Sequence, residues 1–341
     1  MTSHTVTLVF DDGRIARIQA DEDDTIYLAA LKHRIRIETD CLEGACATCK
    51  GVCTSGAYRM DEYSEDALSA EEAARREVLT CQMHVLSDCV IEYPYPSTFS
   101  LKAPPVTRMA RVAEIETVAE GVVRLVVEPE DGEHGPVVFM PGQYVHLGVP
   151  GTDAVRSYSF ANPPAETGRY TFFIKVLEEG AMSGYVAGPA RPGDAMPVTG
   201  PFGRFYLRPP SRPIVMVAGG TGLAPMLSMF DHMLATGATD QPIRLLYGAN
   251  TPAELFSLDA LDDHAGRGLD LTAELCVVEG GDGWSGATGH VTTLLRPEIL
   301  GSGDCDAYLC GPPPMIDAAT DWLAGAGLDP AAIHSEKFLP S

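Results

Sequence analysis

Features that would place this chain in a membrane or on a nucleic acid are missing from its sequence. No apolar run reaches the roughly 18 residues that a membrane-spanning helix needs, and the first residues do not form the apolar core of a signal peptide. Basic residues are scarce, since 24 Lys and Arg stand against 47 Asp and Glu and give a formal net charge of −23. This acidity argues against nucleic acid and anionic membranes as partners. We therefore expect a cytoplasmic protein.

A disulfide framework is missing as well. The 9 cysteines are odd in number and unevenly spaced, whereas disulfide-stabilised domains carry paired cysteines. No internal repeat or low-complexity tract interrupts a composition that is 45% hydrophobic and 21% charged, which is typical of globular proteins. A length of 341 residues predicts about two or three domains.

A cluster of cysteines near the N-terminus predicts a metal site. Its members are Cys41, Cys46, Cys49 and, further along the chain, Cys81. Three thiolates from one tight loop and a fourth from elsewhere are typical of a plant-type [2Fe–2S] cluster. Zinc-binding or purely structural thiols are the alternative, but zinc ribbons use two Cys-x2-Cys pairs and this region has one. Cys53 and Cys89 lie outside the pattern, and we interpret them as small core residues.

The segments around these cysteines predict a small α+β domain. Val6, Leu8 and Phe10 alternate toward a glycine-containing turn, which indicates a β-hairpin. Thr25 can cap a short helix through residue 31. Ser69 and Glu72 form a capping box that predicts a helix reaching residues 76 and 77.

The middle of the chain contains a candidate flavin site. The residues are Arg156, Ser157, Tyr158 and Ser159, in an extended stretch. An Arg can bind phosphate, a Tyr ring can stack on a planar ring system, and a Ser hydroxyl can hydrogen-bond a ring edge. An ordinary half-buried strand would look similar. Strand patterns at 110–115, 122–127, 143–149 and 170–176 predict a small antiparallel barrel, and residues 180–184 open a short helix whose amides could hold a pyrophosphate.

The last third predicts a dinucleotide-binding sheet. An apolar run at 214–218, typical of a buried parallel strand, leads into a glycine-rich loop and a helical pattern. The loop residues that could approach a pyrophosphate are Gly219, Gly220, Thr221, Gly222 and Pro225. Strands at 243–247 and 306–309 alternate with helical stretches, so the domain is predicted to be doubly wound. Cys310, Gly311 and Pro312 follow the last of those strands, where ligands bind in such sheets.

Taken together, these motifs resemble the benzoate and anthranilate 1,2-dioxygenase reductase family over essentially the whole chain. The resemblance implies a β-grasp [2Fe–2S] ferredoxin domain at 1–96, a linker at 97–106, an antiparallel β-barrel FAD domain at 107–208 and an α/β NAD domain at 209–341. It assigns the cluster to the four cysteines and FAD to the stretch at 156–159. It also places Lys175, Gly180, Met182 and Ser183 near the ribityl or phosphate groups of FAD. For Lys175 a solvated strand position is the alternative.

The resemblance further implies how the nicotinamide is held. Cys310 would pack against the nicotinamide near Ser159 and the flavin, Glu336 would lie near this site, and Phe338 would cover the flavin until nicotinamide displaces it. An inert buried thiol and a core aromatic are the alternatives for Cys310 and Phe338. The implied electron path runs from NADH through FAD and the cluster to a terminal oxygenase of the Rieske non-heme iron type. A soluble diiron monooxygenase, a sugar-deoxygenating enzyme, or a redox-sensing role without turnover are the alternatives.

The choice between NADH and NADPH depends on charge after the strand at 243–247. A 2′-phosphate needs an Arg or an equivalent charge just past the second strand. None lies between Arg244 and Arg267, and Glu254 would repel a phosphate placed near it. The sequence therefore favours NADH.

Overall fold

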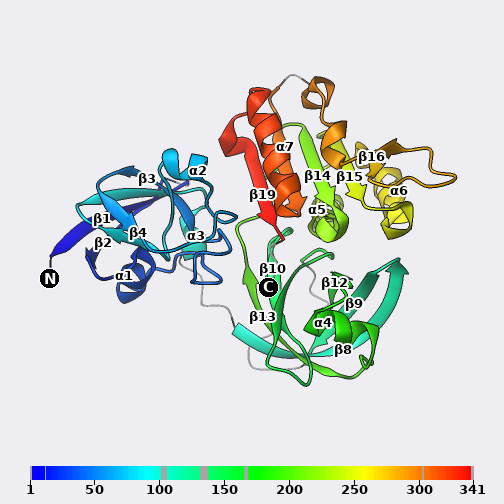
Figure 1. Cartoon of the computed structure of the whole chain (residues 1–341), viewed down its shortest axis with the longest axis horizontal. Helices are drawn as coiled ribbons and strands as arrows, with labels where there is room; N and C mark the ends of the chain where they lie inside the picture. The colour runs from blue at the N-terminus through cyan, green and yellow to red at the C-terminus, as the bar shows by residue number, and fades with distance from the viewer. Residues whose placement is uncertain are drawn as a thin grey trace. The chain divides into compact units, whose positions relative to one another are not determined.

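The computed structural model describes residues 2–11, 13–100, 106–130, 137–164, 168–301 and 303–338. The chain divides into two compact units, one formed by Met1–Pro105 with Phe202–Arg204 and the other by Val106–Pro201 with Phe205–Ser341. Figure 1 shows the first unit in blue to cyan, while the second contains both the barrel and the C-terminal sheet. The exact domain boundaries at 96, 106 and 208 stay predictions. Of the predicted linker 97–106, the described part includes a short helix, α3 (Ser97–Ser100), and residues 101–105 lie outside the described residues.

The N-terminal unit is an α+β domain of the β-grasp type. Its main sheet has the order β2-β1-β7-β3-β5, and β4 pairs with β6. The elements are β1 (Ser3–Phe10), β2 (Ile15–Asp21), α1 (Ile26–Lys32), β3 (Lys50–Ser55), β4 (Tyr58–Met60), α2 (Ala70–Ala74), β5 (Glu77–Leu79), β6 (Met83–Val85) and β7 (Cys89–Tyr93). Strands β1 and β7 run parallel, and β1 pairs with β2 in the predicted hairpin.

Local sequence accounts for most of this unit. Val6, Leu8 and Phe10 all point into the core, as their alternation requires. Thr25 caps α1 as predicted, because its hydroxyl accepts from the backbone of Leu28. The predicted capping box of α2 is also present, but the helix is shorter than expected. It ends at Ala74 because Arg76 adopts a left-handed backbone conformation (φ 64°) and the chain then enters β5.

The barrel sheet is antiparallel and has the order β11-β10-β13-β8-β9-β12. Its elements are β8 (Val106–Ala119), β9 (Val122–Pro129), β10 (Tyr144–Gly148), β11 (Val155–Ser159), β12 (Tyr170–Lys175), α4 (Ala181–Ala187) and β13 (Ala195–Phe202). The two edge strands approach each other, since the amide of Ala161 after β11 donates to Thr171 of β12 over 2.9 Å. This closure encloses a core that includes Phe160, Phe172 and the side chain of Met182 from α4.

The C-terminal sheet is parallel, with the order β17-β16-β15-β14-β18-β19. Its strands are β14 (Ile214–Gly219), β15 (Ile243–Ala249), β16 (Leu271–Val277), β17 (Ala287–Thr288), β18 (Asp306–Gly311) and β19 (Ile333–Lys337). The helices and 3-10 turns are η1 (Gly220–Gly222), α5 (Leu223–Thr236), η2 (Pro252–Glu254), α6 (Leu258–Gly266), η3 (Val291–Leu294), η4 (Pro297–Leu300), α7 (Pro313–Gly325) and η5 (Pro330–Ala332).

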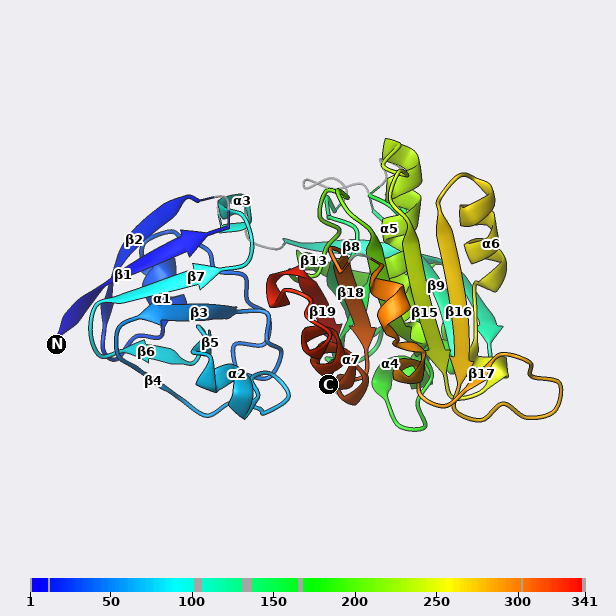
Figure 2. The same ribbon diagram turned by 90° about the horizontal axis from the view of Figure 1, so that it is seen from above.

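Both faces of this sheet are covered, as the continuous apolar run of β14 predicts. Met216 and Ala218 of β14 pack in one core with α5 and α6, while Val215 and Val217 pack in another with α7. Figure 2 shows β15 and β16 side by side, with α5 and α6 near them, and β14 pairs with β15 on the side away from β16. The strand order reverses between β14 and β18, so the carboxyl ends of these two strands form the topological switch point at which such sheets bind ligands.

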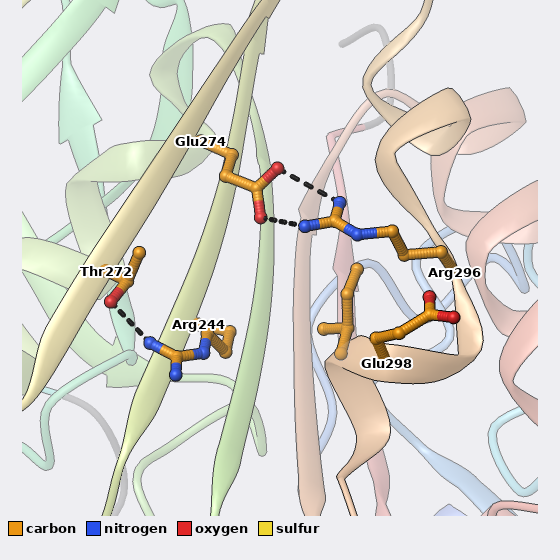
Figure 3. A pocket seen from close by; sticks show the side chains of 6 residues that line it. Arg244, Thr272, Glu274, Arg296 and Glu298 are labelled. Carbon is orange, nitrogen blue, oxygen red and sulfur yellow. Dashed lines mark hydrogen bonds and ion pairs between the residues drawn. The ribbon is translucent and has the colours of Figure 1, made fainter.

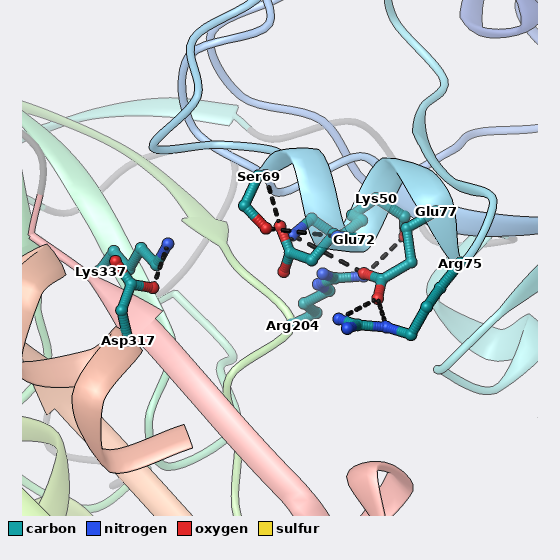
Figure 4. Close-up of polar contacts among 8 residues, drawn as sticks. All are labelled: Lys50, Ser69, Glu72, Arg75, Glu77, Arg204, Asp317 and Lys337. Carbon is teal, nitrogen blue, oxygen red and sulfur yellow. Dashed lines mark hydrogen bonds and ion pairs between the residues drawn. The ribbon is translucent and has the colours of Figure 1, made fainter. Parts of the chain in front are cut away.

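A partly buried ion pair fixes α2 against the sheet of the N-terminal unit (Figure 4). One carboxylate oxygen of Glu72 lies 2.6 Å from the Lys50 ammonium, and the other accepts the backbone N–H of Ser69 over 2.8 Å. Burial lowers the pKa of Lys50, and the carboxylate of Glu72 counteracts that shift. Glu72 therefore completes the helix cap and neutralises a buried cation at the same time.

We expect Glu72→Ala to destabilise the N-terminal unit by about 2–3 kcal/mol, because it removes part of the cap and leaves Lys50 without its nearest carboxylate. Denaturant titration followed by the absorbance of the iron–sulfur domain measures this loss. Glu71→Ala is the matched control, because it removes the same charge from an exposed neighbouring position of α2. Equal losses in the two variants would contradict the role given to Glu72.

Candidate functional site

The four predicted cluster cysteines come together as two pairs. Cys41 contacts Cys46, and Cys49 contacts Cys81. In each pair the shared hydrogen bond lowers the pKa of one thiol, that of Cys41 to about 5 and that of Cys81 to about 7, and raises the pKa of its partner. A [2Fe–2S] cluster binds two thiolates at each of two irons. Two pairs of thiols therefore suit such a cluster better than a single metal ion.

Backbone amides of the loop point at these sulfurs. The N–H groups of Glu43 and Ala45 donate to Cys41 Sγ over 3.5 and 3.3 Å, and the N–H of Cys41 donates to Cys46 Sγ over 3.4 Å. The loop can bend this tightly only with glycine at position 44, whose φ is +72° and where an added Cβ would lie 2.8 Å from Tyr63. The donors and the thiol pairs fit a cluster with negatively charged sulfurs.

The candidate flavin residues lie on β11 at the edge of the barrel sheet. Ser159 pairs with Tyr144, and Tyr158 pairs with Val145 of β10. Because side chains alternate along a strand, Arg156 and Tyr158 share one face, while Ser157 and Ser159 share the other. The Tyr158 ring is half-buried against the barrel core, and burial raises the pKa of its hydroxyl. A neutral ring beside a guanidinium suits stacking and phosphate binding.

Lys175, the second predicted cation of this site, connects the barrel to the C-terminal sheet. Its ammonium lies 2.9 Å from the carboxylate of Glu254 in η2. Nearby, the N–H of Glu120 donates to Ala253 over 2.8 Å, and the rings of Phe173 and Phe256 lie 4.5 Å apart. The contact therefore holds the loop after β15 against the barrel.

In the segment from Gly180 to Ser183, two of the predicted side chains are engaged within the protein. Met182 is buried in the barrel core, and the Ser183 hydroxyl accepts the N–H of Leu177 over 3.0 Å. Ser183 thus fixes the turn between β12 and α4. Its predicted contact with a ligand would have to come from backbone amides near Gly180.

At the switch point, the glycine-rich loop after β14 packs directly on the end of β18. An added Cβ at Gly222 would lie 2.1 Å from the carbonyl oxygen of Cys310, so only glycine fits there. Gly220 differs, because its φ of +53° is left-handed and an added Cβ would meet nothing within 4 Å. Packing between the loops explains Gly222, whereas the space above Gly220 suits the close approach of a pyrophosphate. Thr221 and Pro225 belong to the same turn, at the start of α5.

Cys310 is fully buried beneath this loop. Burial raises the pKa of its thiol well above the ordinary value, and the nearby charge of Glu336 adds to the shift. Glu336 lies opposite Cys310 in the register of β18 and β19. Phe338 follows two residues later, donates its N–H to Gly311 over 2.9 Å and packs against the core that contains Cys310. The structure thus gathers Cys310, Glu336 and Phe338, and the neutral thiol can contribute shape rather than acid–base chemistry.

The two arginines considered for a 2′-phosphate lie elsewhere. Arg244 is the second residue of β15, about 16 Å before its carboxyl end, and bonds to Thr272. Arg244 and Thr272 line a pocket together with Glu274 and Arg296 (Figure 3). In it, the guanidinium of Arg296 makes a two-point ion pair with the carboxylate of Glu274, at 2.6 and 3.0 Å. Arg267 lies 3.2 Å from Asp263 after α6. Glu254 lies in η2, just after the carboxyl end of β15. Burial acts to raise the pKa of Glu254, but Lys175 together with hydrogen bonds from Asn250 lowers it overall.

Two residues of the site were not predicted from the sequence. Met315, in the first turn of α7, fits against both loops, since a Cβ at Gly219 or Gly311 would lie 2.7 or 2.8 Å from its side chain. Gln82 donates to Leu42 over 2.9 Å and to Cys81 Sγ over 3.7 Å. Met315 lies three residues after Pro312, and Gln82 lies one residue after Cys81. This closeness in sequence to predicted site residues was the one signal that could have identified them.

Among the described residues, no helix has both the length and the apolarity that crossing a membrane requires. Three family models match successive parts of the chain. They are the 2Fe-2S iron-sulfur cluster binding domain at residues 9–86, the oxidoreductase FAD-binding domain at 109–206 and the oxidoreductase NAD-binding domain at 216–321. The predicted cofactors, FAD, NAD and a [2Fe–2S] cluster, are confirmed at the level of these domains.

Full-length relatives agree with this order. The chain is 39% identical to the 2-halobenzoate 1,2-dioxygenase electron transfer component of Burkholderia cepacia, over 99% of this chain and 98% of that protein. It is 37% identical to the toluate 1,2-dioxygenase electron transfer component of Pseudomonas putida, over 99% of both. Among solved structures, the Amycolatopsis cytochrome P450 reductase GcoB matches with a TM-score of 0.72 and 28% identity, over 99% of both chains. With its thiol pairs, barrel strand and glycine loop in this order, the chain belongs to the family of 1,2-dioxygenase electron transfer components, which are NAD- and FAD-dependent iron–sulfur oxidoreductases.

Proposed function

We propose that this protein passes electrons from NADH to the terminal oxygenase of an aromatic-ring dioxygenase, an oxygenase of the Rieske non-heme iron type, in the cytoplasm. The observation that carries the proposal is the full-length similarity to two 1,2-dioxygenase electron transfer components. When bound, FAD would supply the chemistry that links a two-electron donor, NADH, to a one-electron acceptor, the iron–sulfur cluster. The chain itself supplies binding, orientation and exclusion of water.

Each part of the site has a separate task in this proposal. Cys41, Cys46, Cys49 and Cys81 hold the cluster, and the loop amides stabilise its negative charge. Arg156 binds the pyrophosphate of FAD, Tyr158 stacks on its ring system, and Ser159 hydrogen-bonds the ring edge. Gly220 admits the pyrophosphate of NADH, while Cys310 and Phe338 shape the space for its nicotinamide. Glu336 sets the charge beside Cys310.

The acceptor is tested by reconstitution. Purified protein loaded with FAD and iron should couple NADH oxidation to cis-dihydroxylation by a purified benzoate-type oxygenase. Coupling only to a diiron monooxygenase, or to a sugar-deoxygenating enzyme, would replace the proposed acceptor. Absence of rapid NADH-dependent cytochrome c reduction would favour the redox-sensing alternative.

In the same assay, Cys46→Ser separates the two halves of the electron path. We expect it to abolish the cluster and cytochrome c reduction while ferricyanide reduction, which can draw on the flavin, persists. The cluster and the flavin lie in different compact units, so the flavin content should not change. A parallel loss of both activities with normal FAD content would contradict the order NADH, flavin, cluster.

Coenzyme preference should depend on the charge at Glu254. We expect NADH to be preferred over NADPH by at least about 10-fold in kcat/KM, or about 1.4 kcal/mol. Glu254→Gln should narrow this preference because it removes a carboxylate at the carboxyl end of β15, whereas Lys175→Gln should widen it because Glu254 loses its counter-charge. Steady-state kinetics with both coenzymes measure the two changes, at FAD contents checked by absorbance.

Asp259→Asn, an exposed acid on α6, is the matched control and should leave the preference unchanged. Identical shifts in Glu254→Gln and Asp259→Asn would assign the preference to overall charge rather than to this position.

The nicotinamide site is tested at Cys310 and Phe338. Cys310→Ala should slow flavin reduction by NADH about 10-fold in single-turnover mixing, because positioning within about 3–3.5 Å determines this step. Phe338→Ala should alter NADH binding and the charge-transfer absorbance, because a competing ring is removed. Spectra of the cluster should be unchanged in both variants.

Cys305→Ala provides the control, because Cys305 is also a fully buried thiol of the parallel-sheet domain but lies before β18. Wild-type flavin reduction in both site variants, or losses that follow the unfolding temperature alone, would mean that Cys310 and Phe338 serve only in core packing.

A further inference from the structure

Two cysteines outside the cluster lie together in the N-terminal unit. Cys53 of β3 pairs in register with Ile91 of β7, and Cys89 begins β7 two residues earlier. Residues two apart on a strand share a face, so the side chains of Cys53 and Cys89 lie on the same side of the sheet. They are 0% and 2% exposed, and the two thiols are close enough for each to shift the pKa of the other. The Cys53 thiol also lies 3.2 Å from the carbonyl of Ser55, and the Cys89 thiol lies 3.4 Å from that of Ser87.

A guanidinium is fixed over this pair. Arg76 Nη2 lies 3.4 Å from Cys53 Sγ, and the same side chain donates to the carbonyl of Cys53 over 2.7 Å and to that of Gly56 over 2.6 Å. The guanidinium also lies over the ring of Tyr58, 5.1 Å from its centroid. Four contacts therefore hold one cation beside one sulfur, in a segment where Arg76 takes a left-handed backbone conformation.

These contacts make the two thiols chemically different. The hydrogen bond from Cys89 lowers the pKa of Cys53 to about 6 and outweighs burial, and Arg76 adds to the shift. The same hydrogen bond and burial raise the pKa of Cys89. Thiolates next to a cation react with oxidants, whereas thiols that are merely buried do not. Because Arg76 lies beside Cys53 Sγ, Cys53 is the expected nucleophile of the pair and Cys89 the expected resolving thiol.

We propose that Cys53, Cys89 and Arg76 form an oxidant-sensitive dithiol site whose substrate is a small hydroperoxide such as hydrogen peroxide. The Cys53 thiolate attacks one peroxide oxygen, the O–O bond breaks, and the leaving hydroxide takes up a proton to become water. Cys53 is thereby oxidised to a sulfenic acid. Cys89 then attacks the Cys53 sulfur, the S–S bond forms, the S–O bond breaks, and a second water leaves with the proton of Cys89. In total, two thiols and one peroxide give a disulfide and two waters.

Access and consequence both follow from the position of the site. Arg76 is an exposed residue that contacts Cys53 Sγ, so the buried thiol lies one side chain away from the surface. The disulfide would close the chain between residues 53 and 89, the segment that carries the cluster cysteine Cys81. The oxidised form would therefore constrain the unfolded chain around a cluster ligand.

The test uses the full holoprotein with hydrogen peroxide in small molar excess. Samples are blocked with N-ethylmaleimide under denaturing conditions, digested and examined by mass spectrometry. The expected product is a peptide pair joined through Cys53 and Cys89, formed while the visible spectrum of the cluster is still intact and reversed by dithiothreitol. Cys276 and Cys305 serve as internal controls, because both are buried thiols and neither pairs with a second cysteine among the described residues.

Variants distinguish the two roles. Cys89→Ser, which keeps a hydroxyl donor beside Cys53 but cannot form a disulfide, should leave a Cys53 sulfenic acid that dimedone traps, whereas Cys53→Ala should leave Cys89 unmodified. Arg76→Gln should slow oxidation of Cys53 about 10-fold, because the thiolate loses its cation. Arg59→Gln is the matched control, because Arg59 is an exposed Arg of the same unit that pairs with Asp61.

The proposal is overturned if the linked peptide is absent, if Cys276 and Cys305 oxidise at the same rate, or if the disulfide appears only after the cluster absorbance is lost. If Arg76→Gln fails to fold, as shown by loss of the cluster spectrum before oxidant is added, the two cysteine variants alone decide the outcome.

Discussion

The contact between Gly222 and the carbonyl of Cys310 is the constraint on which the dinucleotide site depends. Two strands adjacent in the parallel sheet, β14 and β18, send their carboxyl ends to the same point. No side chain fits between them at Gly222, so the glycine loop rests directly on the backbone of β18. This leaves Gly220 facing open space, with Cys310 and Glu336 on the strands just beyond. The shape of the site thus results from backbone packing, and its side chains adjust that shape.

The dinucleotide site also depends on the packing of the barrel against the parallel sheet. Several contacts of different kinds hold the two together. The ion pair of Lys175 with Glu254 and the backbone hydrogen bond from Glu120 to Ala253 join the barrel to the loop after β15. On α5, the Ser228 hydroxyl donates to the carbonyl of Asn162 over 2.7 Å, and Asn162 follows the end of β11 by three residues. Because partly buried and backbone contacts weaken little with salt, the geometry of the two cofactor sites should depend little on ionic strength.

Much of this arrangement could be predicted from the sequence, because its signals are local. The apolar run of β14, the capping box at Ser69 and the cysteine spacing each reflect neighbours within a few residues. The predicted length of α2 was wrong. Arg76 has a left-handed backbone conformation that ends the helix, and its side chain bonds to Cys53, 23 residues away in the sequence. The ion pair between Lys175 and Glu254 could not be predicted either, because no local sequence pattern links a lysine on a strand to a glutamate in a distant loop. Site residues that act through contacts between distant parts of the sequence can be identified only from the three-dimensional structure.

An acidic chain that binds anionic cofactors must place its positive charge with care. With a net charge of −23, the average field of the protein opposes phosphate groups. Of the two cations predicted for the flavin site, Lys175 forms an ion pair with Glu254, so Arg156 is the one expected to attract the phosphates of FAD more strongly. Neutral donors such as the backbone N–H groups at Gly220 and near Gly180 can supply the rest, because an amide attracts phosphate without adding a charge. Neutral donors are also used at the cluster site, where backbone amides donate to the sulfurs of Cys41 and Cys46. Binding through backbone donors would let the surface stay acidic while one chain holds three anionic groups.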